Sequence, residues 1–563
     1  MVDKTDMIQY LLDSKRVVYR RPRRYGKTLT VSMLKYFFYG ATKLFKGTKV
    51  FSKAIVLPKF QWSPSDLSAH CFPPRPVLHF DFSISTCHTK SDFENLLRTQ
   101  MKVIGNSFCI PEVTYTSSGN DISNQLTLLI EELCRSKWNR WGNVVVLVDE
   151  YDSVLNRLDV SLELKIDVVS VIKSMFSTIK SKDSKIAFAY VTGITSYGMA
   201  GLYSGANNFV DLSHDPNLHS LCGFTEGEVR QVLGSMSEKE FSDLKDYYNG
   251  YSFLLEPKNK IPRVFNPVTI NKYYNERTLK PYWGVSNSES LVKYFPRIQK
   301  IISTLPCSVP ISILTAPIDY TSWNSTEVSS LAKLLLESGY LTVVDFDDSS
   351  NAMLDFPNQE IKSIVSTDLK SNVLLVSNIK LSNATSELNN GNLSYLLILA
   401  NEIRVLSPFY HNIVYSAEAS WHELITTILH CMHSDIKFSS EKANAYGRSD
   451  ILILTRTGIF FVLELKRLDT DDLDKKSPKV QWNKLNAIDT YKGLAKTLAL
   501  KGIQQIIDKS YLSSTFYRDN VRDIKSVQYA SVVAVNSPSV KKFLYLVQQL
   551  QAGDPASQRE HYF

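Results

Sequence analysis

The alternation of short apolar runs with amphipathic stretches over the first 213 residues constrains the fold of this 563-residue chain more than any other feature. Helix-like stretches such as LTVSMLKYFF (29–38) and SNQLTLLIEELCRSK (123–137) separate the apolar runs. Strands that alternate with helices predict a parallel sheet with crossover helices, so the expected fold class is α/β. The apolar runs, rich in β-branched residues, are RVVYR (16–20), PVLHFDFS (76–83), NVVVLVDEYD (143–152) and KIAFAYVTGIT (185–195).

Changes in periodicity divide the rest of the chain. After an N-terminal domain of residues 1–223, residues 224–346 are mainly helical, as in TEGEVRQVLGSM (225–236), and are expected to form a lid or connector. Residues 347–392 are rich in Ser, Asn and Asp, which predicts a linker. In residues 393–563 a helix (416–433) precedes the strands RSDILILTR (448–456) and GIFFVLELKR (458–467), whose junction at Thr457-Gly458 predicts a β-hairpin.

Composition indicates an ordinary globular protein, with 44% apolar and 21% charged residues. Lys and Arg (64) against Asp and Glu (56) give a net charge of +8, which permits a polyanionic partner without requiring one. The seven scattered cysteines form no CxxC pair, so neither a zinc site nor a disulfide framework is predicted. Because no apolar run approaches the ~18 residues of a membrane span and the N-terminus lacks a signal-peptide core, an intracellular protein is expected, cytoplasmic or nuclear and not membrane-bound.

The segment RRPRRYGKT (20–28) lies between an expected strand and an expected helix. A P-loop needs this context, because the backbone N–H groups of its turn and of the helix start face a phosphate. Lys27 would reach the terminal phosphates, Thr28 would hold the metal, and Gly26 completes the second half of the pattern. Arg21 occupies the position of the first glycine. GKT alone is often accidental, so the flanking strand and helix carry the prediction.

A second element, VVVLVDEYD (144–152), is an apolar strand that ends in adjacent acids. In a Walker B element, Asp149 would hold Mg²⁺ and Glu150 would orient the attacking water. The alternative is a buried strand whose final acids meet solvent or cap a helix. Thr192, near the end of another strand, would sense the γ-phosphate or be an ordinary strand-end threonine. Arg24 is expected to neutralise phosphate, and nucleic-acid contact by PRR (22–24) is the alternative.

The order of motifs along almost the whole chain resembles the AAA-ATPase-like family, whose P-loop typically reads RPRRFGKS. The missing first glycine is then a family trait. The family usually begins somewhat upstream of VDKT, and it is similar to AAA and STAND-type ATPases. The resemblance implies ATP, in preference to GTP, with Mg²⁺. The shared motifs are VDKTDMI, RRPRRYGKT, LVDEYD, YVTGIT with SGANNFVDLS, GFTEGEV, YYNGYSF with VFNPVTI, PYWGVSN and ESGYLT.

The C-terminal hairpin carries a candidate PD-(D/E)xK site, in which carboxylates gather divalent metals and a lysine assists phosphodiester hydrolysis. Asp450 opens one strand, and Glu464 and Lys466 end the next. Residues two apart share a face of a strand, so these three side chains can converge. Glu418 on the preceding helix matches the helix motif E-x-x-Y-H of the family that the chain resembles, which implies it as an additional metal ligand, with Glu423 as the alternative. Glu-x-Lys alone is common on protein surfaces, so the prediction depends on the whole array.

The family resemblance adds GRxD, ELK and a helix with Q-I-x-x-K-x-Y, which here begins at Gln505. In that helix Lys509 and Tyr511 are expected to be a surface cation and a packed aromatic, with phosphate contact as the alternative. The long charged insertion after ELKR is expected to be a solvated loop. His422 has no His or Cys partner at metal-ligand spacing, which favours a packed histidine.

The expected architecture is therefore a P-loop NTPase sheet, a helical middle region and a C-terminal α/β restriction-endonuclease-like domain. The expected function is an ATP-binding and ATP-hydrolysing module that regulates a Mg²⁺- or Mn²⁺-dependent nuclease acting on DNA or RNA. The alternative is a STAND-like, non-catalytic platform for nucleic acid or protein that is switched by nucleotide. A small-molecule kinase is disfavoured, because it leaves the second domain unexplained. AAA-type rings usually take an arginine from a neighbour, so a homo-oligomer stays open.

Overall fold

The chain forms two compact units in a computed structural model, Met1–Ser286 with Pro306–Ile361, and Asn287–Leu305 with Lys362–Phe563. No helix among the described residues is long and apolar enough to cross a membrane. The structure describes residues 2–52, 74–83, 87–116, 121–137, 139, 142–157, 159–196, 208–256, 262–284, 301–302, 304–317, 328–407, 410, 418–432, 436–440, 443–444, 447–448, 451–469, 484–508, 515–536, 543–549 and 558–562.

A five-stranded parallel sheet forms the centre of the first unit, with strand order β2-β3-β4-β1-β5. The strands are β1 (Arg16–Arg20), β2 (Val77–Asp81), β3 (Val144–Asp149), β4 (Ile186–Gly193) and β5 (Val210–Asp211). The first four coincide with the apolar runs of the sequence, and the predicted parallel α/β sheet is confirmed. β1 and β3 are buried along their whole length, as strands covered on both faces must be.

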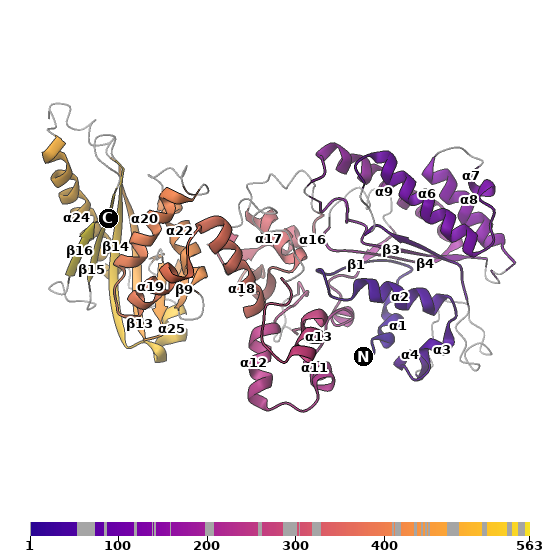
Figure 1. Cartoon of the computed structure of the whole chain (residues 1–563), viewed down its shortest axis with the longest axis horizontal. Helices are drawn as coiled ribbons and strands as arrows, with labels where there is room; N and C mark the ends of the chain where they lie inside the picture. Colours follow the sequence, from indigo (N-terminus) through magenta and orange to yellow (C-terminus); the bar gives the residue numbers. More distant parts are fainter. Residues whose placement is uncertain are drawn as a thin grey trace. The chain divides into compact units, whose positions relative to one another are not determined.

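Helices cover both faces of this sheet (Figure 1). The long helices α6 (Lys90–Ser107), α8 (Ile122–Arg135) and α9 (Leu162–Ser181) lie on one face, and α1 (Ile8–Leu12) and α2 (Lys27–Phe38) on the other. A capping box starts α6, since Thr89 accepts from the backbone of Asp92 while the Asp92 side chain accepts from Thr89. The shorter helices are η1 (Thr5–Met7), α3 (Thr42–Phe45), α4 (Lys49–Ser52), α7 (Glu112–Thr116) and η2 (Asp183–Lys185).

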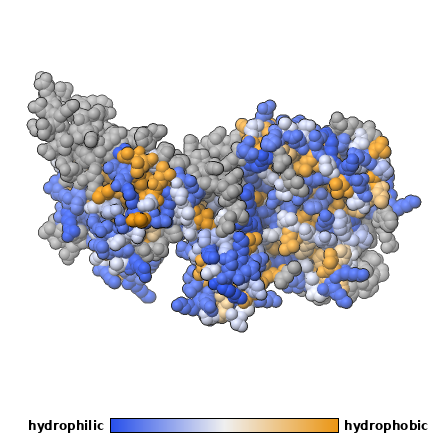
Figure 2. Space-filling view, in the orientation of Figure 1, coloured by the Kyte–Doolittle hydropathy of each residue, from blue (hydrophilic) through white to orange (hydrophobic). Residues whose placement is uncertain are grey.

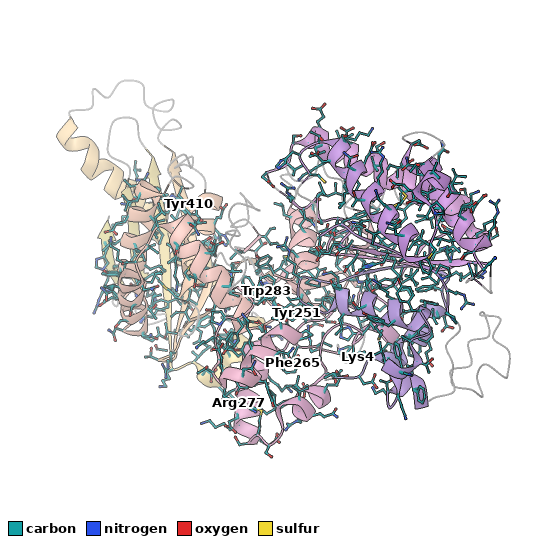
Figure 3. All side chains as sticks on the ribbon, turned by 45° about the vertical axis from the view of Figure 1, so that its right-hand side comes forward. Lys4, Tyr251, Phe265, Arg277, Trp283 and Tyr410 are labelled. Carbon is teal, nitrogen blue, oxygen red and sulfur yellow. The ribbon has the colours of Figure 1, made fainter. Side chains whose placement is uncertain are left out.

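The rest of the first unit is helical with a small sheet. The three-stranded antiparallel sheet has the order β6-β8-β7, which the prediction of a mainly helical region did not include. Tyr251, Phe265 and Trp283 are buried in this part of the unit (Figure 3). Its elements are η3 (Pro216–Leu218), α11 (Glu226–Leu233), α12 (Glu238–Tyr248), α13 (Pro267–Glu276), β6 (Cys307–Val309), α16 (Ile311–Thr315), α17 (Val328–Ser338), β7 (Thr342–Phe346) and β8 (Ala352–Asp355).

Residues 347–392, expected as a linker, are mostly folded. They contain β8, α18 (Gln359–Asp368), the π-helical turn η5 (Leu369–Leu374) and α19 (Asn378–Asn389). The Ser and Asn residues that suggested a linker cap these helices. Ser377 accepts from Lys380 N at the start of α19, and Asn358 accepts from Ile361 N at the start of α18. The division between the two units falls within α18.

A six-stranded mixed sheet forms the centre of the second unit, with the order β16-β15-β14-β13-β12-β9. Only the pair β13–β14 is parallel. The predicted hairpin is confirmed, since β12 pairs antiparallel with β13. The strands are β9 (Ile436–Ser440), β12 (Ile451–Thr455), β13 (Ile459–Asp469), β14 (Ser526–Asn536), β15 (Phe543–Gln549) and β16 (Gln558–Tyr562), and β10 (Ala443–Asn444) pairs separately with β11 (Gly447–Arg448).

Helices pack on this second sheet. α24 (Lys484–Asp508) contacts β13, β14 and β15, and its Ala495, Ala499 and Ile503 pack with Leu452 and Val462 of the hairpin. α22 (Glu418–Cys431) contacts β13 and β9, and α20 (Ser394–Leu406) contacts β15. Hydrophobic side chains gather on the visible face of this unit over α20 (Figure 2), where Val405 and Leu406 are exposed. The remaining elements are α25 (Thr515–Asn520) and η7 (Val521–Asp523).

Candidate functional site

The loop between β1 and α2 has the form of a phosphate-binding turn. Gly26 caps α2 in the left-handed region at φ 94°, and Arg24 is also left-handed at φ 69°. A Cβ at Gly26 would meet no other atom within 4 Å, so the backbone angle, and not crowding, favours glycine there. Because Gly26 has no side chain to cap the helix, the N–H groups of the first turn are left for another acceptor. This is the helix start at which anions bind.

Lys27 is buried at the first position of α2. Its side chain is 5% exposed, and Nζ donates to the carbonyl oxygen of Pro22 at 3.0 Å. Burial lowers the pKa of Lys27, whereas the nearby carboxylates of Glu150, Asp152 and Asp149 raise it. The buried Lys27 cation therefore lies within electrostatic range of the acids at the end of β3.

Asp149 and Glu150 lie at the end of β3, as the sequence predicted. The Asp149 carboxyl is buried, and its Oδ1 atom has no hydrogen-bond partner in the described part of the chain. Burial raises the pKa of Asp149, and a hydrogen bond from Thr28 and the charge of Lys27 oppose that shift. Burial also raises the pKa of Glu150, whose backbone is left-handed at φ 50°. The structure therefore brings Lys27, Thr28, Asp149 and Glu150 together.

Asp81 is a further acid of this site that the sequence analysis missed. It ends β2 and is the register partner of Asp149 across the parallel pair β2–β3. Its charge raises the pKa of both Asp149 and Glu150. The signal was present, because PVLHFDFS is also an apolar strand with an acid at its carboxyl end.

Thr192 is buried near the end of β4, and its carbonyl oxygen accepts from Tyr151 N at 3.2 Å. The loop that follows β4 is held by Asp152. The Asp152 carboxylate accepts from Thr195 N at 2.6 Å and from Thr195 Oγ1 at 2.7 Å. A Cβ at Gly193 would lie 2.4 Å from Asp152 Oδ1, so this packing requires glycine. The Asp152 carboxylate therefore has a structural role, which is to hold the loop after β4 beside the candidate site.

The arginines of the loop have different surroundings. Arg21, at the position of the missing glycine, is buried between the rings of Tyr19 and Phe253, 4.3 and 4.2 Å from their centroids. The Arg21 backbone is not in the left-handed region, and its side chain packs between these two rings outside the loop. This position therefore does not require glycine. Arg20 pairs with Asp211 and Glu337. The partly exposed Arg24 donates to the carbonyl oxygen of Trp283.

The candidate acid–lysine site of the second unit lies on β13 under α24. Glu464 is buried, and its Oε1 accepts from Lys466 Nζ at 2.7 Å and from the Gln505 amide of α24. Gly502 lets α24 approach closely, because a Cβ there would lie 2.1 Å from Ser531 Oγ. Gln505 was noted in the sequence only as the start of a helical pattern, and the structure places it against the acid.

Other residues of the predicted second site are not described. The β12–β13 register runs from Ile451↔Leu463, and Asp450 lies outside the described residues, as do Lys509 and Tyr511. Glu418 begins α22, but its side chain is outside the described part. His422 is buried in α22. Within the residues whose side chains are described, no group of three or more His, Cys, Asp or Glu could hold a metal ion.

Comparisons with known proteins give a family match for the N-terminal part of the chain and a relative that is similar over most of it. Residues 1–203 match the model of the AAA-ATPase-like family, described as predicted AAA-ATPase, which confirms the motif-based prediction for this segment. The chain is also 24% identical over 497 residues to an uncharacterized protein in the vnfD 5' region of Azotobacter chroococcum mcd 1. That match covers 83% of this chain and 85% of the relative, so it extends beyond the first unit.

One solved structure is similar at a low level. The Aeropyrum pernix ORC1 protein, solved in complex with DNA, is 9% identical, with a TM-score of 0.23. The similarity covers 66% of this chain and 93% of that protein.

Proposed function

We propose that the first unit binds ATP with Mg²⁺ and hydrolyses it. The observation that carries the proposal is the buried Lys27 at the start of α2, facing Asp149 and Glu150 across the end of a parallel sheet. In this proposal Lys27 exchanges its contact with the Pro22 carbonyl for phosphate oxygens. The first-turn N–H groups of α2, Arg24 and Thr192 supply further phosphate contacts.

The residues at the end of β3 fit a divalent cation. Asp149 Oδ1 is buried without a hydrogen-bond partner in the described part of the chain, and the exposed Thr28 lies near the same carboxyl group, where its hydroxyl lowers the pKa of Asp149. A carboxylate and a hydroxyl are oxygen ligands of the kind that Mg²⁺ takes beside nucleotide phosphates. Bound Mg²⁺ would offset phosphate charge. Glu150 would orient the attacking water and accept its proton.

We further propose that the second unit is a nuclease that uses Mg²⁺ or Mn²⁺ to cleave a phosphodiester bond of DNA or RNA. Glu464 and Lys466, on one face of β13, support this role, with Asp450 and Glu418 as proposed further ligands. The Lys466 ammonium is held beside the carboxylate at 2.7 Å, where it could offset charge on a scissile phosphate.

A nucleotide-switched binding platform is the second candidate, and one observation favours it. The acid of the second site already has internal partners, since Lys466 and the Gln505 amide both donate to Glu464 Oε1. A carboxylate with satisfied hydrogen bonds is also what a structural position requires.

Cleavage of labelled single- and double-stranded DNA and RNA in Mg²⁺ or Mn²⁺, with and without ATP, separates the two. Wild type is compared with Lys27→Ala and Lys466→Ala. Exposed lysines serve as matched controls, Lys239→Ala in the first unit and Lys437→Ala in the second. We expect cleavage that is lost in Lys466→Ala and altered by ATP only when Lys27 is intact. Nucleotide binding without cleavage would overturn the nuclease and support the platform, for which Ca²⁺ and Mg²⁺ should give equal nucleic-acid binding.

A further inference from the structure

The motif ESGYLT (337–342) has no role in the sites above, yet it packs on the phosphate-binding loop. It ends α17 and leads into β7. Gly339, at φ 89°, approaches Pro22 so closely that a Cβ there would lie 2.7 Å from the proline side chain. Tyr340 stacks edge-on against Trp283, with ring centroids 4.9 Å apart, and the Trp283 carbonyl accepts from Arg24. The turn after α17 is thus fitted to this loop.

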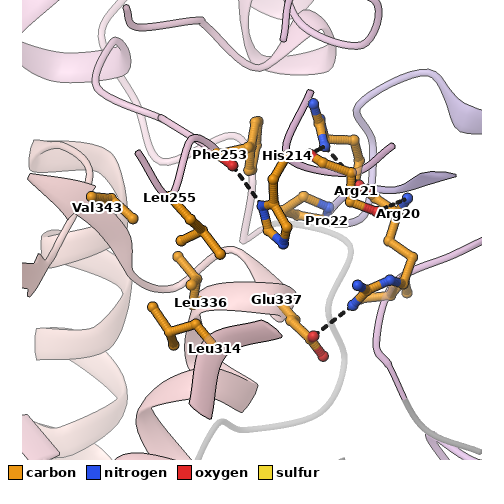
Figure 4. A pocket seen from close by; sticks show the side chains of 12 residues that line it. Arg20, Arg21, Pro22, His214, Phe253, Leu255, Leu314, Leu336, Glu337 and Val343 are labelled. Carbon is orange, nitrogen blue, oxygen red and sulfur yellow. Dashed lines mark hydrogen bonds and ion pairs between the residues drawn. The ribbon is translucent and has the colours of Figure 1, made fainter. Parts of the chain in front are cut away.

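Glu337 divides its carboxylate between two segments that face the candidate phosphate site. Oε1 accepts from Arg20 Nη1 at 2.6 Å, and Arg20 is the last residue before the loop (Figure 4). Oε2 accepts from the backbone N–H of Ser196 at 2.8 Å, in the loop that follows β4 and Thr192. The Glu337 side chain is 10% exposed. One carboxylate therefore joins the phosphate-binding loop, the β4 loop and α17.

The charges around Glu337 favour this arrangement. Arg20 pairs on its other side with Asp211 of β5. Lys333, one turn earlier on α17, lies 3.9 Å from Glu337 Oε1 and donates to the carbonyl of Ile313. Separating the buried Arg20–Glu337 pair would leave an uncompensated charge. The pair therefore keeps the phosphate-binding loop, the β4 loop and α17 in contact.

The packing beside this contact leaves some room. A cavity of about 30 Å³ is lined by Arg20, Pro22, Ile194 and Glu337 together with apolar side chains of Leu336 and Val343 (Figure 4). Close-packed interiors resist small displacements, whereas a void beside a contact lets it adjust. The side chains around the Glu337 contact can therefore adjust into this small void.

We propose that Glu337 is a positioning residue for the nucleotide site. It holds the β4 loop against the phosphate-binding loop. Through this contact, nucleotide binding alters the mobility of α17 and of β7, the strand that follows α17. This inference rests on the proposed nucleotide function. Glu337 itself touches no phosphate in this scheme, because its carboxylate is occupied by Arg20 and Ser196.

Hydrogen exchange of the full chain, with and without the non-hydrolysable analogue AMP-PNP and Mg²⁺, tests the inference. In wild type, AMP-PNP is expected to slow amide exchange in residues 331–341. Glu337→Gln keeps an oxygen for Ser196 N–H but loses the charge that faces Arg20. We expect it to reduce this protection at least ~5-fold while the Kd for AMP-PNP changes less than ~3-fold. Glu337→Asp, which keeps the charge, should restore part of the protection.

Glu131→Gln is the matched control. Glu131 pairs with Lys182 at 2.6 Å and is partly buried, at 22% exposed, but its contact lies before the start of β4, at the opposite end of the strands from the phosphate-binding loop. The coupling would be overturned if AMP-PNP slowed exchange in residues 331–341 equally in wild type and Glu337→Gln, or did not slow it in wild type that has bound AMP-PNP. Either result would leave the proposed nucleotide function standing. A binding titration that shows no AMP-PNP bound by wild type would overturn the proposed nucleotide function, and the coupling with it.

Discussion

The two candidate sites place a buried carboxylate in opposite circumstances. In the first unit, Asp149 Oδ1 is buried without a hydrogen-bond partner in the described part of the chain. In the second, Glu464 Oε1 accepts from both Lys466 and Gln505. A buried polar atom left unsatisfied costs about 1–3 kcal/mol, so a fold keeps one where an external ligand can compensate. Asp149 Oδ1 is therefore open to the Mg²⁺ of the proposed function, whereas Glu464 Oε1 already has two internal donors.

The two candidate sites also differ in the elements that supply their side chains. The first site gathers side chains from the carboxyl ends of β2 and β3 and from the loop after β1, which are far apart in the sequence. The second takes Glu464 and Lys466 from one strand and Gln505 from the helix that covers it. A parallel sheet edge collects loops around an open crevice, whereas a strand covered by a helix is closed by that helix.

Lys27→Ala should abolish the first site. The buried ammonium is the proposed counter-charge of the terminal phosphates, so we expect the Kd for fluorescently labelled ATP to rise at least ~100-fold. Exposed Lys239 provides the control, and Lys239→Ala should bind as wild type does. If Lys27→Ala bound ATP with a Kd within ~3-fold of wild type, the loop would not be the phosphate-binding site.

Glu150→Gln should separate chemistry from binding at that site. A residue that accepts the proton of the attacking water contributes roughly 100-fold or more, so hydrolysis should fall by that factor while ATP affinity is retained. Because burial raises the pKa of Glu150, wild-type hydrolysis should increase with pH until the carboxyl ionises, above its usual titration range. Phosphate release from Glu150→Gln at the wild-type rate would exclude Glu150 as the base.

Lys466→Met tests the internal satisfaction of the second site. Its loss removes the Lys466 ammonium from the buried Glu464 and keeps the Gln505 amide, and we expect the unit to lose about 2 kcal/mol of stability. Lys466 is partly exposed, so the loss should be less than for a fully buried pair. Urea unfolding followed by hydrogen exchange in peptides of β13 and β14 gives the value. Lys437→Met on the edge strand β9 is the control, and equal stability of the two variants would contradict the comparison.

The same contrast explains what the sequence could predict. β1, β3 and β4 were predictable because strands buried on both faces are continuous apolar runs, and the order of Gly26, Lys27 and Thr28 is local to one turn. Asp81 was missed because its role depends on β2 lying beside β3, a pairing that the sequence does not specify. Glu337 was missed for the same reason, since Arg20 and Ser196 are distant in the sequence.

Residues 347–392 show a different limit. Their Ser, Asn and Asp content suggested a linker, but Asn358 and Ser377 use their side chains as helix caps. Capping and loop formation draw on the same residue types, because both satisfy backbone N–H groups with a short polar side chain. Composition alone therefore does not separate a linker from a series of capped helices.

Glu360 provides the smallest and most specific test, because it is a buried carboxyl that accepts hydrogen bonds from the neutral donors Trp283 N and Thr269 Oγ1. It accepts from Trp283 N at 2.8 Å and from the Thr269 hydroxyl, and burial raises its pKa to about 7. Between its unfolded pKa, about 4.5, and about 7, the folded chain holds a proton that the unfolded chain releases, so stability falls as pH rises through this window. Glu360→Gln keeps the acceptor without the ionisation. It should therefore remove a decline on the order of 1 kcal/mol between pH 5.5 and 7.5. Urea unfolding of the full chain at both pH values, followed by hydrogen exchange in the peptides that contain β3 and β4, gives the midpoints that measure this decline. An equal decline in Glu360→Gln would assign it to another group.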